Sequence, residues 1–292
     1  MEKQKEPTIG FIGQGWVGKT YADMFFERGY DVIRYGLEEP YRQNKDDIPG
    51  CDIVFIAVPT PTTQEEFDDS IVREAVGLVG AGKTAVIKST VLPGTTESIQ
   101  KEYPNKFVFH APEFLTEANA KADVRNPSRN IIGRPKDNSE YNNRAQTVID
   151  ILPDAPTEMI CDSKEAELVK YAGNTFLYMK VLFANLFYDL AETEDIDWAT
   201  VRQGMVADER IGETHLEPVH HSQPGKKPAR GAGGDCFIKD FSAIKQLFAD
   251  TLKDEKAQKI FAALEDKNIE LLCDTNKDTD ILKEVYGDDV CK

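Results

Sequence analysis

The stretch TIGFIGQGWVGKTYADMFFERG, residues 8–29, decides the fold of the N-terminal half. A short β-rich run leads into glycines at positions 13, 15 and 18, and an amphipathic helical pattern follows them. Glycines spaced GxGxxG between a strand and a helix permit a tight turn, the approach of the backbone to a pyrophosphate, and close helix–strand packing. A second β-rich run, DVIRY at 31–35, comes at the distance that a βαβ unit requires. The stretch therefore predicts a dinucleotide-binding unit.

Further β-rich runs continue this alternation with helical patterns between most of them. They are DIVFIAV (52–58), TAVIK (84–88), KFVFHAP (106–112), NIIG (130–133) and TEMIC (157–161). Such alternation predicts an α/β fold, a Rossmann-like doubly wound parallel sheet covered by helices on both faces. We expect this dinucleotide-binding domain to span residues 1–162.

After Asp162 the pattern becomes helical. Residues 163–193 contain no proline, and Asp162 and Glu165 are placed as an N-cap and its capping-box partner. This predicts one helix of roughly 30 residues, about 45 Å long. A helix that outgrows a small domain favours contact with a second subunit, so we expect a homodimer through 163–193. The whole of 163–292 is predicted to be a mostly helical central domain, which includes Cys236.

Two more helical patterns follow, at 239–252 and 254–268, and the acidic tail from Cys273 is expected to be peripheral. Between them and the long helix, residues 208–235 form a polar segment rich in glycine and proline, which is too long for an inert connection.

Composition excludes several classes of function. A net charge of −16 argues against nonspecific nucleic-acid binding, and no apolar run is long enough to cross a membrane. The start of the chain is too short for a signal peptide, so we expect a cytoplasmic protein. Five widely spaced cysteines without a CxxC pair argue against a disulfide framework and a zinc site. Each cysteine is expected to act singly, and no metal is expected.

The cofactor is predicted to lie at the carboxyl edge of the sheet. The loops IAVPTPTT (56–63) and IKSTVLPGTTES (87–98) follow the third and fourth strands and offer hydroxyl groups. The acid that usually binds the ribose should fall near Gly36, and Glu38 could replace it. Arg34 or Arg42 would instead favour a 2′-phosphate, so NAD is predicted with NADP as the alternative. The expected cofactor contacts are Gly13, Gly15, Trp16, Val17, Gly18, Glu38, Pro59, Thr60, Thr90 and Lys239.

Three groups of residues suggest chemistry. Glu113 and Glu117 would share one face if their segment is helical, and apolar neighbours predict burial of Glu113. Lys170 and Asn174, four apart on the long helix, could stabilise an oxyanion.

Cys236 is the third. Gly233 and Gly234 precede it and are expected to open the approach to its thiol. A helix predicted to begin at about 237–240 and the nearby Lys239 favour a thiolate. We therefore expect a reactive cysteine.

In these stretches the chain resembles the UDP-glucose and GDP-mannose dehydrogenase family of nucleotide-sugar dehydrogenases. The matching segments run in family order over residues 8–245 and include GFIGQGWVG, KSTVLPGTT, PEFLTEANAKAD, EAELVKYAGNTF, DERIG and GGDCFIKD. The resemblance implies oxidation of a sugar C6 alcohol to the acid with two NAD per turnover, most directly UDP-glucose to UDP-glucuronate.

It also implies residue roles. Cys236 would form a thiohemiacetal and then a thioester, Lys170 and Asn174 would stabilise oxyanions, and Asp240 would position water. Thr90 and Glu117 would handle water and protons, and Arg210 would reach the neighbouring subunit's site. The substrate contacts implied or proposed are Glu113, Phe114, Leu115, Glu117, Lys170, Asn174, Arg210, Lys226, Lys227, Arg230 and Gly233.

The sequence departs from the family in four places. Its helices are followed by too few residues for the family's C-terminal nucleotide-binding domain, so a short variant is expected. The segment from Arg210 to Gly233 is longer than usual, and its Lys226, Lys227 and Arg230 suggest a replacement diphosphate clamp. Leu186 stands where glutamate is common, and the ribose acid near Gly36 is missing.

Two alternatives remain open from the sequence. A two-electron β-hydroxyacid dehydrogenase shares the fold and a Lys-xxx-Asn helix but needs no cysteine. A non-catalytic dinucleotide-binding protein would bind NAD without oxidising any nucleotide sugar.

Overall fold

A computed structural model describes residues 6–64 and 66–292. The described residues form two compact units. The first comprises the chain up to Pro61 together with Asp68–Lys170, and the second comprises Thr62–Phe67 together with Tyr171–Lys292.

Within the described residues, the first unit contains one seven-stranded sheet in the order β2-β1-β3-β4-β5-β6-β7. All seven predicted strands are confirmed. They are β1 (Ile9–Ile12), β2 (Val32–Tyr35), β3 (Ile53–Ile56), β4 (Thr84–Ile87), β5 (Phe107–His110), β6 (Asn130–Arg134) and β7 (Glu158–Asp162).

The predicted parallel sheet is confirmed, with one antiparallel pairing near its edge. Strands β1 to β5 are parallel to one another, but β6 pairs antiparallel with β5, and β7 then runs parallel to β6. Between β5 and β6 the chain forms only the short helices η2 (Glu117–Asn119) and α4 (Ala120–Asp123). These short helices do not form the long crossover helix that usually joins parallel strands, and β6 enters the sheet in the opposite direction.

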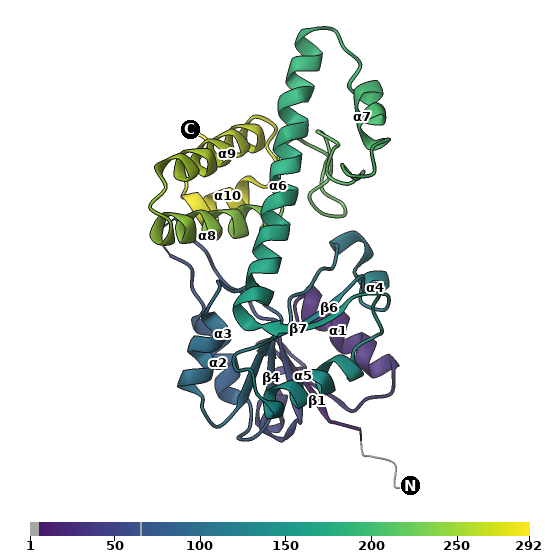
Figure 1. Cartoon of the computed structure of the whole chain (residues 1–292), viewed down its shortest axis with the longest axis vertical. Helices are drawn as coiled ribbons and strands as arrows, with labels where there is room; N and C mark the ends of the chain where they lie inside the picture. Colours follow the sequence, from purple (N-terminus) through teal and green to yellow (C-terminus); the bar gives the residue numbers. More distant parts are fainter. Residues whose placement is uncertain (1–5, 65) are drawn as a thin grey trace. The chain divides into compact units, whose positions relative to one another are not determined.

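Helices cover both faces of the sheet. They are η1 (Arg42–Gly50), α1 (Trp16–Glu27), α2 (Ser70–Leu78), α3 (Thr95–Glu102) and α5 (Ser139–Ile151). Phe25 of α1 and Tyr141 of α5 share one core with Phe11, Phe55 and Phe109 of the strands, whereas α2 and α3 lie on the other side (Figure 1). Coverage on both faces explains why β1, β3 and β4 are buried along their whole length.

The predicted long helix is α6 (Ser163–Thr193), with 31 residues. One of the two hydrogen bonds of its predicted capping box is present, because the backbone N–H of Asp162 donates to the Glu165 carboxylate at 2.8 Å. Residues to Lys170 belong to the first unit and the rest of α6 to the second.

Four shorter helices complete the second unit. They are α7 (Trp198–Val206), α8 (Asp235–Thr251), α9 (Glu255–Asp274) and α10 (Thr279–Tyr286). Tyr178 of α6 stacks on Phe241 of α8 with ring centroids 3.9 Å apart.

Two expectations about the tail are wrong. The residues of α10 are not peripheral, because Ile281, Leu282 and Val285 are buried in a core with α8 and α9. Cys273 and Cys291 form a disulfide, so not every cysteine acts singly. The chain turns back through α10 and brings two cysteines 18 residues apart together, which spacing alone does not reveal. In the described part of the chain, no helix has both the length and the apolar character needed to cross a membrane.

Candidate active site

The glycine turn after β1 has the geometry that a dinucleotide needs. A Cβ on Gly13, which has a φ of +92°, would lie 2.1 Å from the carbonyl oxygen of Ala57, and one on Gly18 would lie 2.1 Å from that of Gly13. These two glycines are required by packing. A Cβ on Gly15 would meet no atom within 4 Å, so this position faces open space. The turn therefore fits a pyrophosphate at the N-terminus of α1.

The two predicted ligand loops lie together at the carboxyl edge of the sheet. Ser89, after β4, donates its hydroxyl to the carbonyl of Val58 at 2.7 Å and accepts from the Val58 N–H at 3.0 Å, and Val58 follows β3. In these loops Thr60 is buried, Thr90 is half-buried and Pro59 is exposed.

Gln14 is a candidate cofactor residue that the sequence reasoning missed. A Cβ on Gly36, just after β2, would lie 3.3 Å from Cγ of Gln14, so the glutamine fills the place of the missing acid's side chain. Its Nε2 donates to the carbonyl of Gly13 at 3.1 Å, whereas its buried Oε1 has no partner among the described residues. Arg34, one of the two cations considered for a 2′-phosphate, instead pairs with Asp23 at 2.5 Å.

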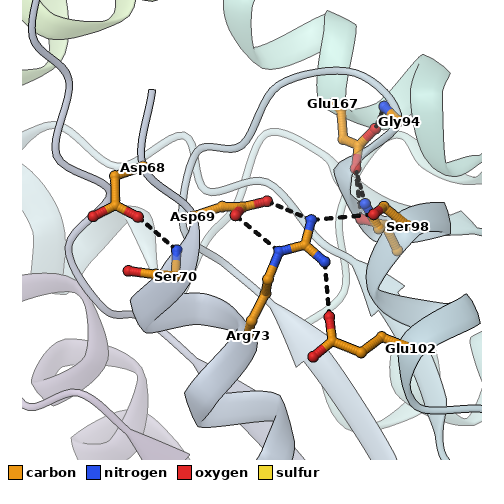
Figure 2. A network of polar contacts seen from close by, with 9 residues as sticks. Asp68, Asp69, Ser70, Arg73, Gly94, Ser98, Glu102 and Glu167 are labelled. Atoms are coloured by element: carbon orange, nitrogen blue, oxygen red, sulfur yellow. Dashed lines mark hydrogen bonds and ion pairs between the residues drawn. The ribbon is translucent and has the colours of Figure 1, made fainter. Parts of the chain in front are cut away.

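A buried carboxylate fixes the end of the loop that carries Thr90. Glu167, near the start of α6, accepts from the backbone N–H groups of Gly94 at 2.6 Å and Thr96 at 2.8 Å, and from the Thr96 hydroxyl at 2.6 Å (Figure 2). Burial raises the pKa of Glu167 to about 7, although these hydrogen bonds act in the opposite direction. No local sequence pattern predicts this contact, because the partners are 71 and 73 residues apart.

Arg73 lies beside these contacts of Glu167 and supports the helix that follows the same loop. Its guanidinium binds both carboxylate oxygens of Asp69, the carboxylate of Glu102 and the hydroxyl of Ser98 (Figure 2). Arg73 thus joins α2 to α3, the helix that follows the loop.

Glu113 and Lys170 form a buried ion pair within the first unit. The Lys170 ammonium donates to the Glu113 carboxylate at 2.7 Å and to the Glu113 carbonyl at 2.9 Å. Each side chain is only 7% exposed, which confirms the predicted burial of Glu113. Lys88 is buried near them and donates to Ala111 at 3.0 Å, and burial lowers the pKa of Lys88 to about 7.

The expectation that Glu113 and Glu117 share a helical face is wrong. Residues 111–116 are not helical, so Glu113 is buried in a loop whereas Glu117 is exposed at the start of η2. Glu117 lines a shallow hollow together with Trp16 and Thr20 of α1. Phe114 and Leu115 are half-buried, and the guanidinium of Arg129 lies 3.7 Å from the ring centroid of Phe114.

In the second unit, Cys236 is exposed on the first turn of α8, which begins at Asp235, earlier than predicted. Four residues later, Asp240 is buried and accepts from the amide of Asn174 at 2.7 Å. Lys239 is half-buried on the same helix. The structure thus joins two predicted site residues, Asn174 of α6 and Asp240 of α8, the helix that carries the thiol.

The expectation that Gly233 and Gly234 open the approach to the thiol is wrong. Both glycines are buried. A Cβ on Gly233 would lie 2.3 Å from Oδ2 of Asp278, so the residue is glycine because a side chain from the C-terminal segment packs against it.

Two of the three cations proposed as a diphosphate clamp are paired with carboxylates. Lys226 pairs with Asp278 at 2.9 Å, and Arg230 pairs with Asp189 at 2.6 Å, while Lys227 is exposed. Two of the three charges are therefore balanced by carboxylates of the chain. The Arg210 side chain is 89% exposed and pairs with Asp208 at 2.5 Å.

Two family models match the chain. The NAD binding domain of the UDP-glucose/GDP-mannose dehydrogenase family matches residues 41–151, and the central domain of the same family matches residues 164–269. The chain belongs to this family. The first model also confirms the predicted cofactor, NAD.

Individual relatives agree. UDP-glucose 6-dehydrogenase TuaD of Bacillus subtilis is 32% identical over 285 residues, and the match covers 82% of this chain and 58% of that protein. UDP-glucose 6-dehydrogenase of Rickettsia bellii is 31% identical over 248 residues, covering 82% and 54%. The chain thus spans little more than half the length of these two relatives.

Solved structures share the fold. A UDP-glucose dehydrogenase from the archaeon Pyrobaculum islandicum matches with a TM-score of 0.78 and 25% identity, covering 94% of this chain and 71% of that chain. The 3-hydroxyisobutyrate dehydrogenase of Mycobacterium tuberculosis has a TM-score of 0.69 at 15% identity, covering 93% and 95%, which shows a common fold only.

Proposed function

We propose that the chain oxidises the C6 alcohol of a nucleotide sugar to the carboxylic acid with NAD, with UDP-glucose as the first candidate substrate. The observation that carries this proposal is the arrangement on α8. An exposed thiol, Cys236, lies on the first turn, and Asp240, one turn later, is bonded to Asn174. A two-electron β-hydroxyacid oxidation would leave this thiol without a role.

The proposed chemistry proceeds through two successive covalent intermediates on Cys236. Two NAD molecules, bound one after the other, would each supply the acceptor for one hydride from the sugar carbon, one in each of the two oxidations. After the first, the Cys236 sulfur bonds to the aldehyde carbon and the aldehyde oxygen takes a proton, which gives a thiohemiacetal. Loss of a second hydride and of the hydroxyl proton gives a thioester. Water then cleaves the carbon–sulfur bond, releasing the acid and restoring the thiol.

The proposed roles of the other residues follow from their chemistry. Negative charge on the sulfur is favoured at a helix N-terminus. Lys170 and Asn174 are proposed to stabilise negative charge on the substrate oxygen, and Asp240 to orient the attacking water. Glu117 and Thr90 are proposed to move water and protons. Lys239 stays a proposed cofactor contact.

For the cofactor, we propose that Gln14 replaces the missing ribose acid. Its buried Oε1 can accept a hydrogen bond from a ribose hydroxyl but cannot bond to a 2′-phosphate dianion, which has no proton to donate. Binding of NADH and NADPH to Gln14→Leu tests this: we expect weaker NADH binding and a smaller preference over NADPH. An unchanged preference would leave Glu38 as the candidate.

We also propose that a second copy of the chain covers the exposed side of α6. Six large apolar side chains, each at least 40% exposed, recur at helical spacing there: Phe176, Met179, Phe183, Leu186, Phe187 and Leu190. Such a stripe on a helix is typical of a subunit interface. The exposed Arg210 is proposed to reach the substrate of the neighbouring copy.

The test is NADH release with UDP-glucose, UDP-N-acetyl sugars and GDP-mannose, counted per sugar consumed. Two NADH per sugar are expected for one of these, and Cys236→Ser should abolish steady turnover. Cys161→Ala, which removes a buried thiol from β7, is the matched control and should keep it. One NADH per sugar, or full turnover by Cys236→Ser, would favour the two-electron oxidation. NADH binding without any turnover would favour a non-catalytic protein.

A further inference from the structure

The four residues before α8 form a buried turn. Residues 231–234 are all buried and lie outside any helix or strand. Backbone N–H and C=O groups that are buried without partners cost free energy, so such a turn needs hydrogen bonds from elsewhere. Because Cys236 follows directly, whatever satisfies this turn also sets where the thiol lies.

Three buried side chains supply these bonds. Asn268 of α9 accepts from the Ala232 N–H at 2.7 Å and donates to the Ala232 carbonyl at 3.0 Å. Lys277 donates to the Gly231 carbonyl at 2.8 Å, and Asp278 accepts from the Gly234 N–H at 2.8 Å. The three side chains belong to residues that are only 2–4% exposed: Asn268, Lys277 and Asp278.

Packing adds to the hydrogen bonds. A Cβ on Gly233 would lie 2.3 Å from Oδ2 of Asp278 and 2.9 Å from Cε of Lys277. Gly234 is the N-cap residue of α8, with a φ of +88°. The bond from its N–H to Asp278 therefore fixes the residue from which the helix of the thiol starts.

Lys277 and Asp278 also hold part of the long polar segment 208–235. Residues 220 and 229 pair as an antiparallel bridge, which closes a hairpin over 220–229. Lys277 donates to the Ala229 carbonyl at 3.0 Å, and Asp278 accepts from Ser222 at 3.0 Å and Lys226 at 2.9 Å. The hairpin 220–229 and the turn 231–234 are therefore held by one anchor, the pair Lys277 and Asp278. This anchor lies in the loop that the Cys273–Cys291 disulfide closes.

We propose that Lys277 and Asp278 are positioning residues for the Cys236 thiol, which they hold at the start of α8 through the turn 231–234. The proposal rests on the proposed role of Cys236 as nucleophile. Both residues lie beyond residue 269, where the match to the family's central domain ends, so this support comes from a part of the chain that the family model does not describe.

The test is the alkylation rate of Cys236 by iodoacetamide at neutral pH, followed on its own peptide by mass spectrometry. Loosening the turn removes the thiol from the helix N-terminus that favours the thiolate, so Asp278→Ala should slow alkylation at least about fivefold. Asp278→Asn keeps one acceptor oxygen for the Gly234 N–H and should restore much of the rate. The matched control is Asp280→Ala, an exposed acid 3.8 Å from Lys226, which should alkylate normally.

Turnover gives a second measurement. In Asp278→Ala, kcat for the best sugar should fall while NADH binding stays unchanged. A normal alkylation rate in Asp278→Ala overturns the proposal, as does equal slowing in Asp280→Ala. If Asp278→Ala does not fold, the alkylation rate of Lys277→Met, which loses the hydrogen bond to the Gly231 carbonyl, decides: a normal rate there overturns the proposal. Slowed alkylation in a protein that oxidises no sugar would refute the proposed function but not this anchoring.

Discussion

In the glycine turn after β1, we expect Gly15 to be needed for NADH binding and Gly18 to be needed for stability. Gly15 has a φ of −65° and a ψ of −179°, a conformation that alanine adopts without strain, and its Cβ would meet no atom within 4 Å. We therefore expect Gly15→Ala to leave the free energy of unfolding within about 1 kcal/mol of its original value. The added methyl group would, however, stand where the pyrophosphate approaches, and NADH affinity should fall at least tenfold, about 1.4 kcal/mol.

Gly18→Ala should behave in the opposite way. Its Cβ would lie 2.1 Å from the carbonyl oxygen of Gly13, whereas a carbon and an oxygen in contact need about 3.3 Å. Relief requires α1 to move about 1 Å from the turn, which should cost about 1–3 kcal/mol of stability.

Urea unfolding and NADH fluorescence titration measure the two quantities on the same variants. If Gly15→Ala binds NADH as tightly as the unaltered protein, no pyrophosphate crosses this turn and the cofactor assignment of the turn is refuted. If Gly18→Ala is as stable as the original, the close helix–strand packing is refuted instead.

Three further predictions concern the rest of the chain. Phe183→Glu should convert a dimer into a monomer by light scattering, because it places a charge in the apolar stripe of α6, whereas Phe26→Glu, on α1, should not. Dithiothreitol should lower the unfolding midpoint of the chain, since an 18-residue disulfide loop contributes about 3 kcal/mol, and the Cys273→Ala/Cys291→Ala variant should not respond. Burial raises the pKa of Glu167 from 4.5 in the unfolded chain to about 7 in the folded protein. The free energy of unfolding, measured by urea titration and compared with that of Glu167→Gln, should therefore fall by about 3 kcal/mol between pH 4.5 and 7. A pH-independent difference would contradict it.

Local pattern was sufficient for most of the fold. Each strand is a short β-rich run between turn residues, and α6 has both a continuous apolar period and its capping box, so neither depends on distant contacts. The direction of β6 was not predictable in this way, because a strand's sequence is the same in either orientation. The helix α10 was missed because it has only eight residues within an acidic stretch, and its apolar side chains are buried only by α8 and α9.

The residues of the candidate site likewise fall into those that a local sequence pattern marks and those that it does not. Cys236, Asn174 and Asp240 could be named because a motif or helical spacing marks them. Gln14, Glu167 and the residues that hold the turn 231–234 could not be predicted, because their partners are distant in sequence or are backbone groups. A side chain whose task is to satisfy another segment's N–H has no signature of its own.

The glycines before Cys236 show why this matters for experiments. If Gly233→Ala were inactive, the loss would not demonstrate that the substrate approaches over Gly233. The new Cβ would displace Asp278 and so release the Gly234 N–H that starts α8. The thiol would move even if no substrate ever touched Gly233. Only a comparison of alkylation rates in Gly233→Ala and Asp278→Ala can separate the two causes. Equal slowing in both means that the glycine acts through the anchor, whereas normal alkylation with lost turnover in Gly233→Ala would return it to the substrate.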